Sequence, residues 1–470
     1  MKKYRKWIVA GTGAALLGFV AVVLYYAWAL ASIGAAYKAK VLCSGVFVAG
    51  RAPQSLLGAD LMVDDLLVLR HIDVQLDDDA KSVTAGFLGM LKRKAVYRPG
   101  LGCTLVYGAL EDRFKGITAG SAATPQARRY PRPWPIGDAG VIRPAPRELN
   151  KARLDAAVDW AFSEPDPKRP RRTRAVVVVY KGDIVAERYA PGFSKDTSLL
   201  GWSMTKSVIN ALAGILVKAG RLSLNRPVSV PEWQKPGDPL GRITLDQLLH
   251  MSSGLRFDED YSNPLKDVTY MLLGVPDMAA YAAQKPFAAE PGTRWSYASG
   301  TTSIIARVLR DAVGESDYPL FPHRALFDRI GMRSAIIEMD ASGTFVGSSF
   351  MYAGARDWAR FGLLYLRDGI WQGERILPEG WVQYTRTPAP AAPRQEYGAH
   401  FWLRIPAEYR SGNNGPVLPQ DAFHAIGHEG QFVTIIPSRA LVIVRLGLTR
   451  PPNTWAHDTF IGLVLDATRK

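Results

Sequence analysis

Cysteine is scarce in this chain, which has only Cys43 and Cys103 among its 470 residues. Two thiols exclude a disulfide-dense scaffold and a four-cysteine zinc site. The sequence also lacks a Gly-x-Ser-x-Gly elbow, a Walker loop and a His-Glu-x-x-His motif. It therefore disfavours an α/β-hydrolase, a P-loop protein and a metalloprotease. His424 and His428 are four residues apart, but the two glycines beside them disfavour the helix that a metal site of this spacing needs. We predict no metal and no cofactor.

Acidic residues are absent from the first forty positions, which carry six basic ones. The whole chain has 58 basic and 43 acidic residues, giving a formal net charge of +15. No basic helix and no pattern of basic residues interleaved with aromatic ones accompanies this excess. We therefore predict no nucleic-acid partner.

Charge of either sign is missing from Trp7 to Tyr37. A helix needs only about 20 apolar residues to cross a bilayer, and the apolar region of a cleaved signal peptide is shorter, about 7–15 residues. We therefore predict an uncleaved anchor within residues 1–40, with residues 7–37 in the lipid bilayer. The basic residues in front of it predict a cytoplasmic N-terminus. The chain would then be a single-pass protein of the inner (plasma) membrane, with its remaining residues on the periplasmic side.

Both cysteines follow this anchor, so export brings them into an oxidising compartment. We expect a disulfide between Cys43 and Cys103, and the alternative is two unrelated buried thiols. The sequence carries no signal for an oligomeric state.

Three segments follow the anchor. Residues 41–125 are expected to form a small exported pre-domain, with β-rich runs at 72–76, 82–85, 95–97 and 104–107. Residues 126–150 are rich in proline and arginine, which is typical of a linker. Residues 151–470 form the large domain.

The large domain begins and ends with paired β-rich runs. Two hairpins are predicted, one from Ala175–Tyr180 and Ile184–Tyr189, the other from Phe432–Ile436 and Leu441–Leu446. Residues 154–162 and 458–468 have the spacing of helices. Strands at both ends with helices between them predict an α+β fold whose first and last strands lie together.

The strongest chemical signal is Ser203-Met204-Thr205-Lys206, which leads into the apolar stretch Ser207–Val217. Such a stretch predicts a buried helix, and residues three apart share one helix face. Burial lowers the pKa of a lysine, so that its amine can take the proton of a serine hydroxyl. The helix N-terminus offers N–H groups to a developing oxyanion. The alternative is an N-cap serine beside a surface lysine.

Two later segments extend this signal. Tyr297 and Ser299 lie in a turn-rich loop before an apolar helix, where a tyrosine can pass a proton to a leaving group; a packed aromatic ring is the alternative. His428-Glu429-Gly430 precedes the strand at 432–436. Gly430 permits close backbone approach, and the N–H of Gln431 can complete an oxyanion hole with that of Ser203.

Taken together, these motifs and their order resemble those of the serine β-lactamase and penicillin-binding-protein superfamily. Its class C-like branch of esterases and 6-aminohexanoate-oligomer hydrolases is the most similar. The matching motifs are Ser203-x-x-Lys206, Tyr297-x-Ser299 and His428-x-Gly430, supported by residues 243–255 and 355–362. The resemblance spans residues 174–466. It implies an antiparallel sheet flanked by helices, with a helical region.

The resemblance also implies the role of each residue. Ser203 would be the acylated nucleophile, Lys206 its base and Tyr297 the proton relay. Ser299, His428 and Gly430 would contact a small-molecule or peptide-like ester or amide. Residues 257–270 and 397–409 are candidates for the acyl pocket.

Two positions depart from the family pattern. His428 stands where lysine is usual, and it offers less positive charge to a substrate carboxylate at pH 7. Ser299 stands where asparagine is common. Both changes favour ester or amide hydrolysis over a D,D-peptidase or β-lactamase. A non-enzymatic anchored module on the same fold is the third alternative, although a binding protein has no need for the Ser203 and Lys206 pair.

Overall fold

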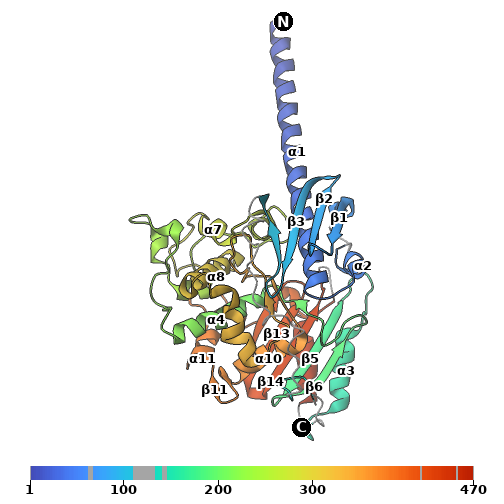
Figure 1. Cartoon of the computed structure of the whole chain (residues 1–470), viewed down its shortest axis with the longest axis vertical. Coiled ribbons are helices and arrows are strands. Elements are labelled where there is room, and N and C mark those ends of the chain that lie inside the picture. Colours follow the sequence, from blue (N-terminus) through green and yellow to red (C-terminus); the bar gives the residue numbers. More distant parts are fainter. Residues whose placement is uncertain are drawn as a thin grey trace.

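A five-stranded antiparallel sheet forms the centre of the large domain (Figure 1). The computed structural model describes residues 2–61, 67–108, 133–139, 146–412, 415–450 and 454–468. The strand order is β12 (Phe423–Gly427), β13 (Gln431–Ile436), β14 (Leu441–Gly447), β5 (Thr173–Tyr180) and β6 (Asp183–Tyr189). β5 pairs with β14, with Val178 opposite Ile443. The predicted adjacency of the first and last strands of the large domain is therefore confirmed, as is the α+β fold class.

Helices cover both faces of this sheet, which explains why every residue of β5 is buried. Its even-numbered side chains, such as Val176 and Val178, pack with α3 (Lys151–Phe162) and α12 (His457–Ala467). The odd-numbered side chains belong to the core on the other face. Two helices supply that core, α4 (Met204–Lys218) and α10 (Ala355–Leu366).

A largely helical region lies beyond α4. Its helices are α5 (Leu245–Leu249), α6 (Asp267–Gly274), α7 (Met278–Ala283), α8 (Ser299–Val313), α9 (Asp328–Ile330) and α11 (Trp381–Arg386). Short strands join it to the sheet domain: β7 (Leu199–Leu200), β9 (Met351–Ala353) and β8 (Ile336–Ile337) form one small sheet, and β10 (Ile370–Trp371) and β11 (Glu374–Arg375) form a hairpin. β7 ends three residues before Ser203, so this small sheet positions the turn in front of α4.

The N-terminal helix α1 (Lys2–Phe47) has two parts with different surroundings (Figure 1). Its first part projects from the body and exposes large apolar side chains from Trp7 to Trp28. Its second part, from Ala29 onward, packs against a four-stranded meander and the large domain. The meander consists of β1 (Ile72–Asp77), β2 (Ser82–Phe87), β3 (Met90–Arg98) and β4 (Gly102–Val106). The short helix α2 (Pro53–Leu56) precedes it in the chain.

The structure thus differs from the expected division at residue 40. α1 continues through that position, and Lys40 forms a buried ion pair with Glu338 of the large domain. Ser44 Oγ donates to the same carboxylate at 2.8 Å, and Cys43 is bonded to Cys103 in β4. Tyr37, expected at the end of the membrane segment, lies within the protein, where its hydroxyl accepts from Arg450 at 3.4 Å. An apolar run that packs on protein has the same composition as one that faces lipid.

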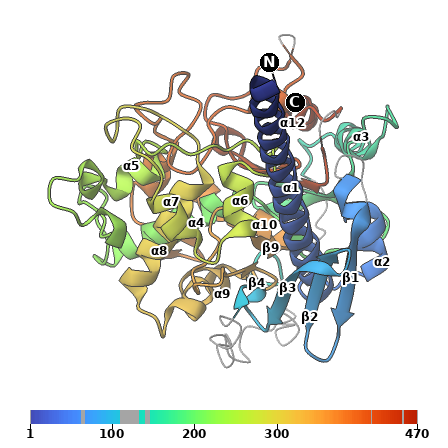
Figure 2. The ribbon, with the colours of Figure 1, turned by 90° about the horizontal axis from the view of Figure 1, so that it is seen from above.

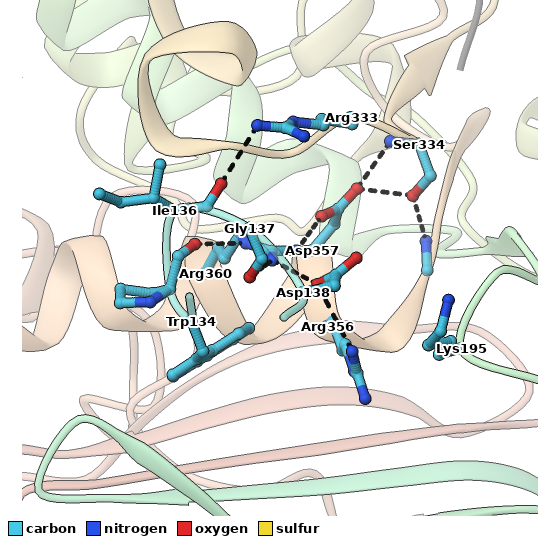
Figure 3. A network of polar contacts seen from close by, with 12 residues as sticks. Trp134, Ile136, Gly137, Asp138, Lys195, Arg333, Ser334, Arg356, Asp357 and Arg360 are labelled. Atoms are coloured by element: carbon cyan, nitrogen blue, oxygen red, sulfur yellow. Dashed lines mark hydrogen bonds and ion pairs between the residues drawn. The ribbon is translucent and has the colours of Figure 1, made fainter. Parts of the chain in front are cut away.

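Most of the predicted linker, residues 126–150, lies outside the described residues, but residues 133–139 pack on α10 (Figure 3). The Trp134 indole N–H donates to the Gly182 carbonyl at 2.8 Å. Arg360 of α10 donates to the Pro135 carbonyl at 2.7 Å and to Asp138 at 2.6 Å. Asp357, one turn earlier on α10, also accepts from Arg360 at 2.6 Å. This part of the segment is therefore a fixed contact of the large domain.

Candidate active site

Ser203 lies at the N-terminus of α4 as its N-cap residue. The turn before it is held in place by the Gly201 N–H, which donates to the Met351 carbonyl of β9 at 2.8 Å. Trp202 has φ +48°, in the left-handed region that a bulky residue rarely adopts. Strain of this kind persists where surrounding contacts fix the backbone, as they do beside this serine.

The Lys206 amine is enclosed and contacts three oxygen atoms. Its Nζ lies 2.9 Å from Ser203 Oγ, 2.9 Å from Ser299 Oγ and 3.0 Å from the Ser348 carbonyl oxygen. Burial lowers the pKa of Lys206 to about 8, and the nearby Glu259 carboxylate partly opposes this shift. Part of the Lys206 population therefore has a neutral amine near pH 7, and this form can accept a proton.

The hydrogen-bond partners of Lys206 determine where the lone pair of its neutral amine points. The Ser348 carbonyl oxygen can only accept, so it takes one amine N–H. Ser299 Oγ donates its own hydrogen to Glu259 Oε1 at 2.5 Å, so it also accepts from Lys206. Both amine N–H groups are then used, and the lone pair faces Ser203 Oγ. This arrangement directs the serine proton toward Lys206.

Glu259 is a site residue that the sequence did not predict. Besides its bond from Ser299 Oγ, it accepts from the Ser299 backbone N–H at 2.7 Å. Burial raises the pKa of the Glu259 carboxyl, while the Lys206 charge and the two Ser299 donors act in the opposite direction. Glu259 belongs to the candidate pocket loop 257–270 but carries no motif of its own. Only the folded chain places it beside Ser299, forty residues away.

Tyr297 lies close to Lys206, just before α8. The Lys206 Nζ is 4.9 Å from the centre of the Tyr297 ring. Burial raises the pKa of the Tyr297 phenol, followed by the effect of Glu259, and contacts with the side chains of Ser203 and Trp402 oppose that rise. The phenol is therefore neutral at physiological pH and holds a proton. The structure brings Ser203, Lys206, Tyr297 and Ser299 into one cluster.

The turn between β12 and β13 approaches the same cluster. A Cβ placed on Gly427 would lie 2.1 Å from the Gly201 carbonyl oxygen, so only glycine permits this contact between the turn and the backbone before Ser203. Gln431 pairs with Gly427 across the hairpin. Its side-chain amide donates to the Gly447 carbonyl at 2.8 Å, which joins the turn to β14. Gly430 has φ +77°, and its carbonyl accepts from Arg445 at 2.6 Å.

The profile of the beta-lactamase family matches residues 157–461, well over half of the chain. The chain belongs to the beta-lactamase family. It is a hydrolase of that family, in agreement with the resemblance found in its motifs.

Individual relatives of this beta-lactamase-family hydrolase have several activities. It is 25% identical to the 6-aminohexanoate-dimer hydrolase of Paenarthrobacter ureafaciens over 319 residues, covering 63% of this chain and 78% of that protein. Its fold is similar to that of a family VIII carboxylesterase, with 18% identity, a TM-score of 0.51, and coverage of 70% of this chain and 98% of that one. A penicillin-binding-protein homologue from Caulobacter crescentus has a TM-score of 0.53 at 16% identity, with coverage of 70% and 99%.

His428 of this beta-lactamase-family hydrolase lies among aromatic side chains. Its ring stacks on Tyr261 at 4.5 Å between ring centres and meets Trp202 edge-on at 5.3 Å. Burial lowers the pKa of His428 and outweighs the opposite effect of Glu429. Glu429 is instead paired with Arg450 at 2.7 Å and accepts from the Trp202 indole at 3.0 Å. The histidine is therefore neutral at pH 7 and supplies no fixed cation.

Two aromatic residues of the candidate pocket loop 397–409 have different surroundings. Trp402 packs beside Tyr297, with 5.2 Å between ring centres, and forms part of the wall of the site. Phe401 is fully buried against Phe423 and Tyr365 and belongs to the core. Two consecutive residues of an extended segment commonly point in opposite directions. The sequence alone does not say which of the two side chains faces the active site.

Proposed function

We propose that this chain is a membrane-anchored serine hydrolase that cleaves an ester or amide bond through an acyl-Ser203 intermediate. The observation that carries the proposal is the 2.9 Å contact between Lys206 Nζ and Ser203 Oγ, together with burial that lowers the pKa of Lys206 to about 8. A nucleophile within hydrogen-bond reach of a base with this pKa is what acyl transfer requires.

In the acylation step, Ser203 Oγ attacks the substrate carbonyl carbon while its proton moves to Lys206. The backbone N–H groups of Ser203 and Gln431 bind the resulting oxyanion. The carbon–oxygen or carbon–nitrogen bond then breaks, and Tyr297 passes a proton to the departing alcohol or amine. Water repeats the attack on the acyl-serine, which releases the acid and restores Ser203.

The remaining residues support this chemistry. Ser299 and Glu259 fix the orientation of the Lys206 lone pair, and Gly430 shapes the turn that carries Gln431. Neutral His428 contacts the substrate without favouring a carboxylate, which is why a general ester or amide is a better substrate than a β-lactam or a cell-wall peptide. The exposed apolar part of α1, residues 7–28, would span the membrane, since about 20 apolar helical residues are long enough to cross a bilayer.

A panel of aryl esters and amides on the purified full-length chain tests the proposal. We expect hydrolysis, together with covalent labelling by a short fluorophosphonate probe, and loss of both in the Ser203→Ala variant. Lys206→Ala should lower kcat by about 10³-fold or more, because a nucleophile and its base act as a unit. Ser207→Ala is the matched control, since Ser207 lies on the same helix but bonds the His400 carbonyl. Hydrolysis that survives in Ser203→Ala would exclude the mechanism, and labelling by fluorescent penicillin with no ester hydrolysis would favour a cell-wall enzyme.

A further inference from the structure

A cavity of about 470 Å³ lies between α1 and the large domain. Its volume is in the range of small-molecule pockets, about 300–1,000 Å³. Most of its wall is apolar, with Leu30 and Ile33 from α1, Leu272 and Leu273 from α6, and Phe350 from the loop before β9. The cavity is therefore formed jointly by the N-terminal helix and the catalytic body.

The position of this cavity along α1 is informative. Large apolar side chains of α1 are exposed up to Trp28, and the wall of the cavity begins at Leu30. In the view toward the face from which α1 emerges, α6 lies beside α1 (Figure 2), and the two helices are in contact. The cavity thus begins where the exposed apolar segment ends.

The other end of the cavity lies beside the candidate active site. Trp202, Tyr261 and His428 line it there and contact one another. Trp202 directly precedes Ser203, and Tyr261 lies two residues after Glu259, the carboxylate that accepts from Ser299. These three aromatic side chains therefore place this end of the cavity next to the catalytic cluster.

Charged groups in the wall are already paired. Lys40 is bonded to Glu338, and Glu429 is bonded to Arg450. The lining described by the structure consequently offers apolar surface and paired charges to an occupant. An ionic substrate would gain little from such a wall, whereas a hydrocarbon chain would be removed from water along its whole length.

We infer that the substrate is a membrane-dissolved ester or amide with a long acyl chain, and that this chain occupies the cavity between α1 and α6. The inference rests on the proposed function and specifies its substrate class. The acyl chain lies along α1 with its carbonyl carbon at Ser203. Ser203 Oγ bonds to that carbon as the bond to the alcohol or amine breaks, the leaving group takes the serine proton, and water then releases the free fatty acid.

A chain-length series of p-nitrophenyl esters, from acetate to hexadecanoate, tests the inference on the full-length chain in phosphatidylcholine vesicles. With the ester concentration expressed as that dissolved in water, each added CH2 should raise kcat/KM by about two- to fourfold until the cavity is filled, because the CH2 is removed from water. For the dodecanoate, the rate should follow the mole fraction of ester in the vesicle lipid. A rate that follows only the bulk ester concentration, or an acetate ester that is the best substrate, would overturn the inference.

Two neighbouring positions on α6 provide a matched pair of variants. Thr269 lines the cavity, so Thr269→Trp would fill part of it, whereas Tyr270 is exposed and lies outside the lining. We expect Thr269→Trp to lower the ratio of dodecanoate to acetate kcat/KM at least tenfold, and Tyr270→Trp to leave the ratio unchanged. An unchanged ratio in Thr269→Trp would overturn the inference.

Fluorophosphonates with two-carbon and twelve-carbon chains provide a readout that does not depend on turnover. The short probe should label Thr269→Trp, which shows that it is folded, while labelling by the long probe should slow at least tenfold relative to wild type. Equal labelling by both probes would contradict the assignment of the cavity. If the chain-length tests fail but wild type hydrolyses the acetate ester and Ser203→Ala does not, the proposed function stands and only the substrate class is wrong. If wild type shows no hydrolysis that depends on Ser203, both proposals are wrong.

Discussion

At the scale of single residues, the proposed chemistry depends on the protonation of Lys206. With a pKa of about 8, roughly a tenth of the amine is neutral at pH 7 and half at pH 8. The neutral form is the base, so kcat/KM for an acetate ester should rise about tenfold from pH 6 to pH 7 and level off above about pH 9. A pH–rate profile checks this, and a rate that is constant from pH 6 to pH 9 would be incompatible with Lys206 as the base.

Glu259 should influence this profile through Lys206. Its negative charge raises the pKa of the amine, so Glu259→Gln should move the rising limb to lower pH by about half a unit to one unit. The glutamine carbonyl can still accept from Ser299 Oγ, but its NH2 group replaces the oxygen that accepts from the Ser299 backbone N–H, so kcat should also fall. Glu290→Gln, at an exposed surface ion pair, is the control. A lower kcat without a shift of the rising limb of the pH–rate profile would indicate that Glu259 is only a structural contact.

Motif residues and loop residues of this site differ in how far they could be predicted. Ser203 and Lys206 share one helix turn, so their 2.9 Å contact follows from local geometry once the helix is recognised. Glu259 and Tyr261 come from a loop without regular spacing, and their contacts with Ser299 and His428 depend on the packing of distant segments. Sequence periodicity contains no information about such contacts.

At the scale of elements, long periodic segments were predictable and short ones were not. The hairpin β5–β6 and the strands β13 and β14 lie within a few residues of their predicted bounds. β7, β8 and β9 have only two or three residues each, and their pairing is set by tertiary contacts. For α1, apolar composition predicted one continuous membrane segment, because hydropathy does not distinguish contact with lipid from contact with protein. The small residues Ala35, Ala36 and Ala39 mark its packed part in the structure.

The contact between the β12–β13 turn and the start of α4 gives a prediction at this scale. In Gly427→Ala, the new Cβ would lie 2.1 Å from the Gly201 carbonyl oxygen and would push the turn away from Ser203. The two oxyanion donors would separate, so kcat should fall about 10²-fold or more, with a smaller change in KM. Gly58→Ala is the control, because nothing lies near its added Cβ. Unchanged kinetics in Gly427→Ala would show that this turn does not form part of the oxyanion hole.

At the scale of the whole molecule, the two parts of α1 should respond differently to truncation. Removal of residues 1–28 leaves the packed part in place and should yield a folded domain in the supernatant after a high-salt membrane wash. Removal of residues 1–40 also deletes Lys40 and leaves the fully buried Glu338 without its cation. An unpaired buried charge of this kind costs about 3–5 kcal/mol, so the shorter chain should melt at a clearly lower temperature or aggregate.

Pelleting assays and thermal unfolding of the two truncated chains measure these effects. Membrane association that persists without residues 1–28 would contradict a single anchor. Equal melting temperatures for the two chains would show that the packed part of α1 does not stabilise the fold.

The continuity of α1 has a consequence for where the enzyme can act. One uninterrupted helix runs from the exposed apolar segment into the interior of the protein, where a disulfide and a buried ion pair fasten it. Under the proposed topology, the catalytic serine is held at a constant height and orientation above the lipid surface. Its encounters with substrate then take place by lateral diffusion in two dimensions, and polymers located far from the bilayer stay beyond its reach.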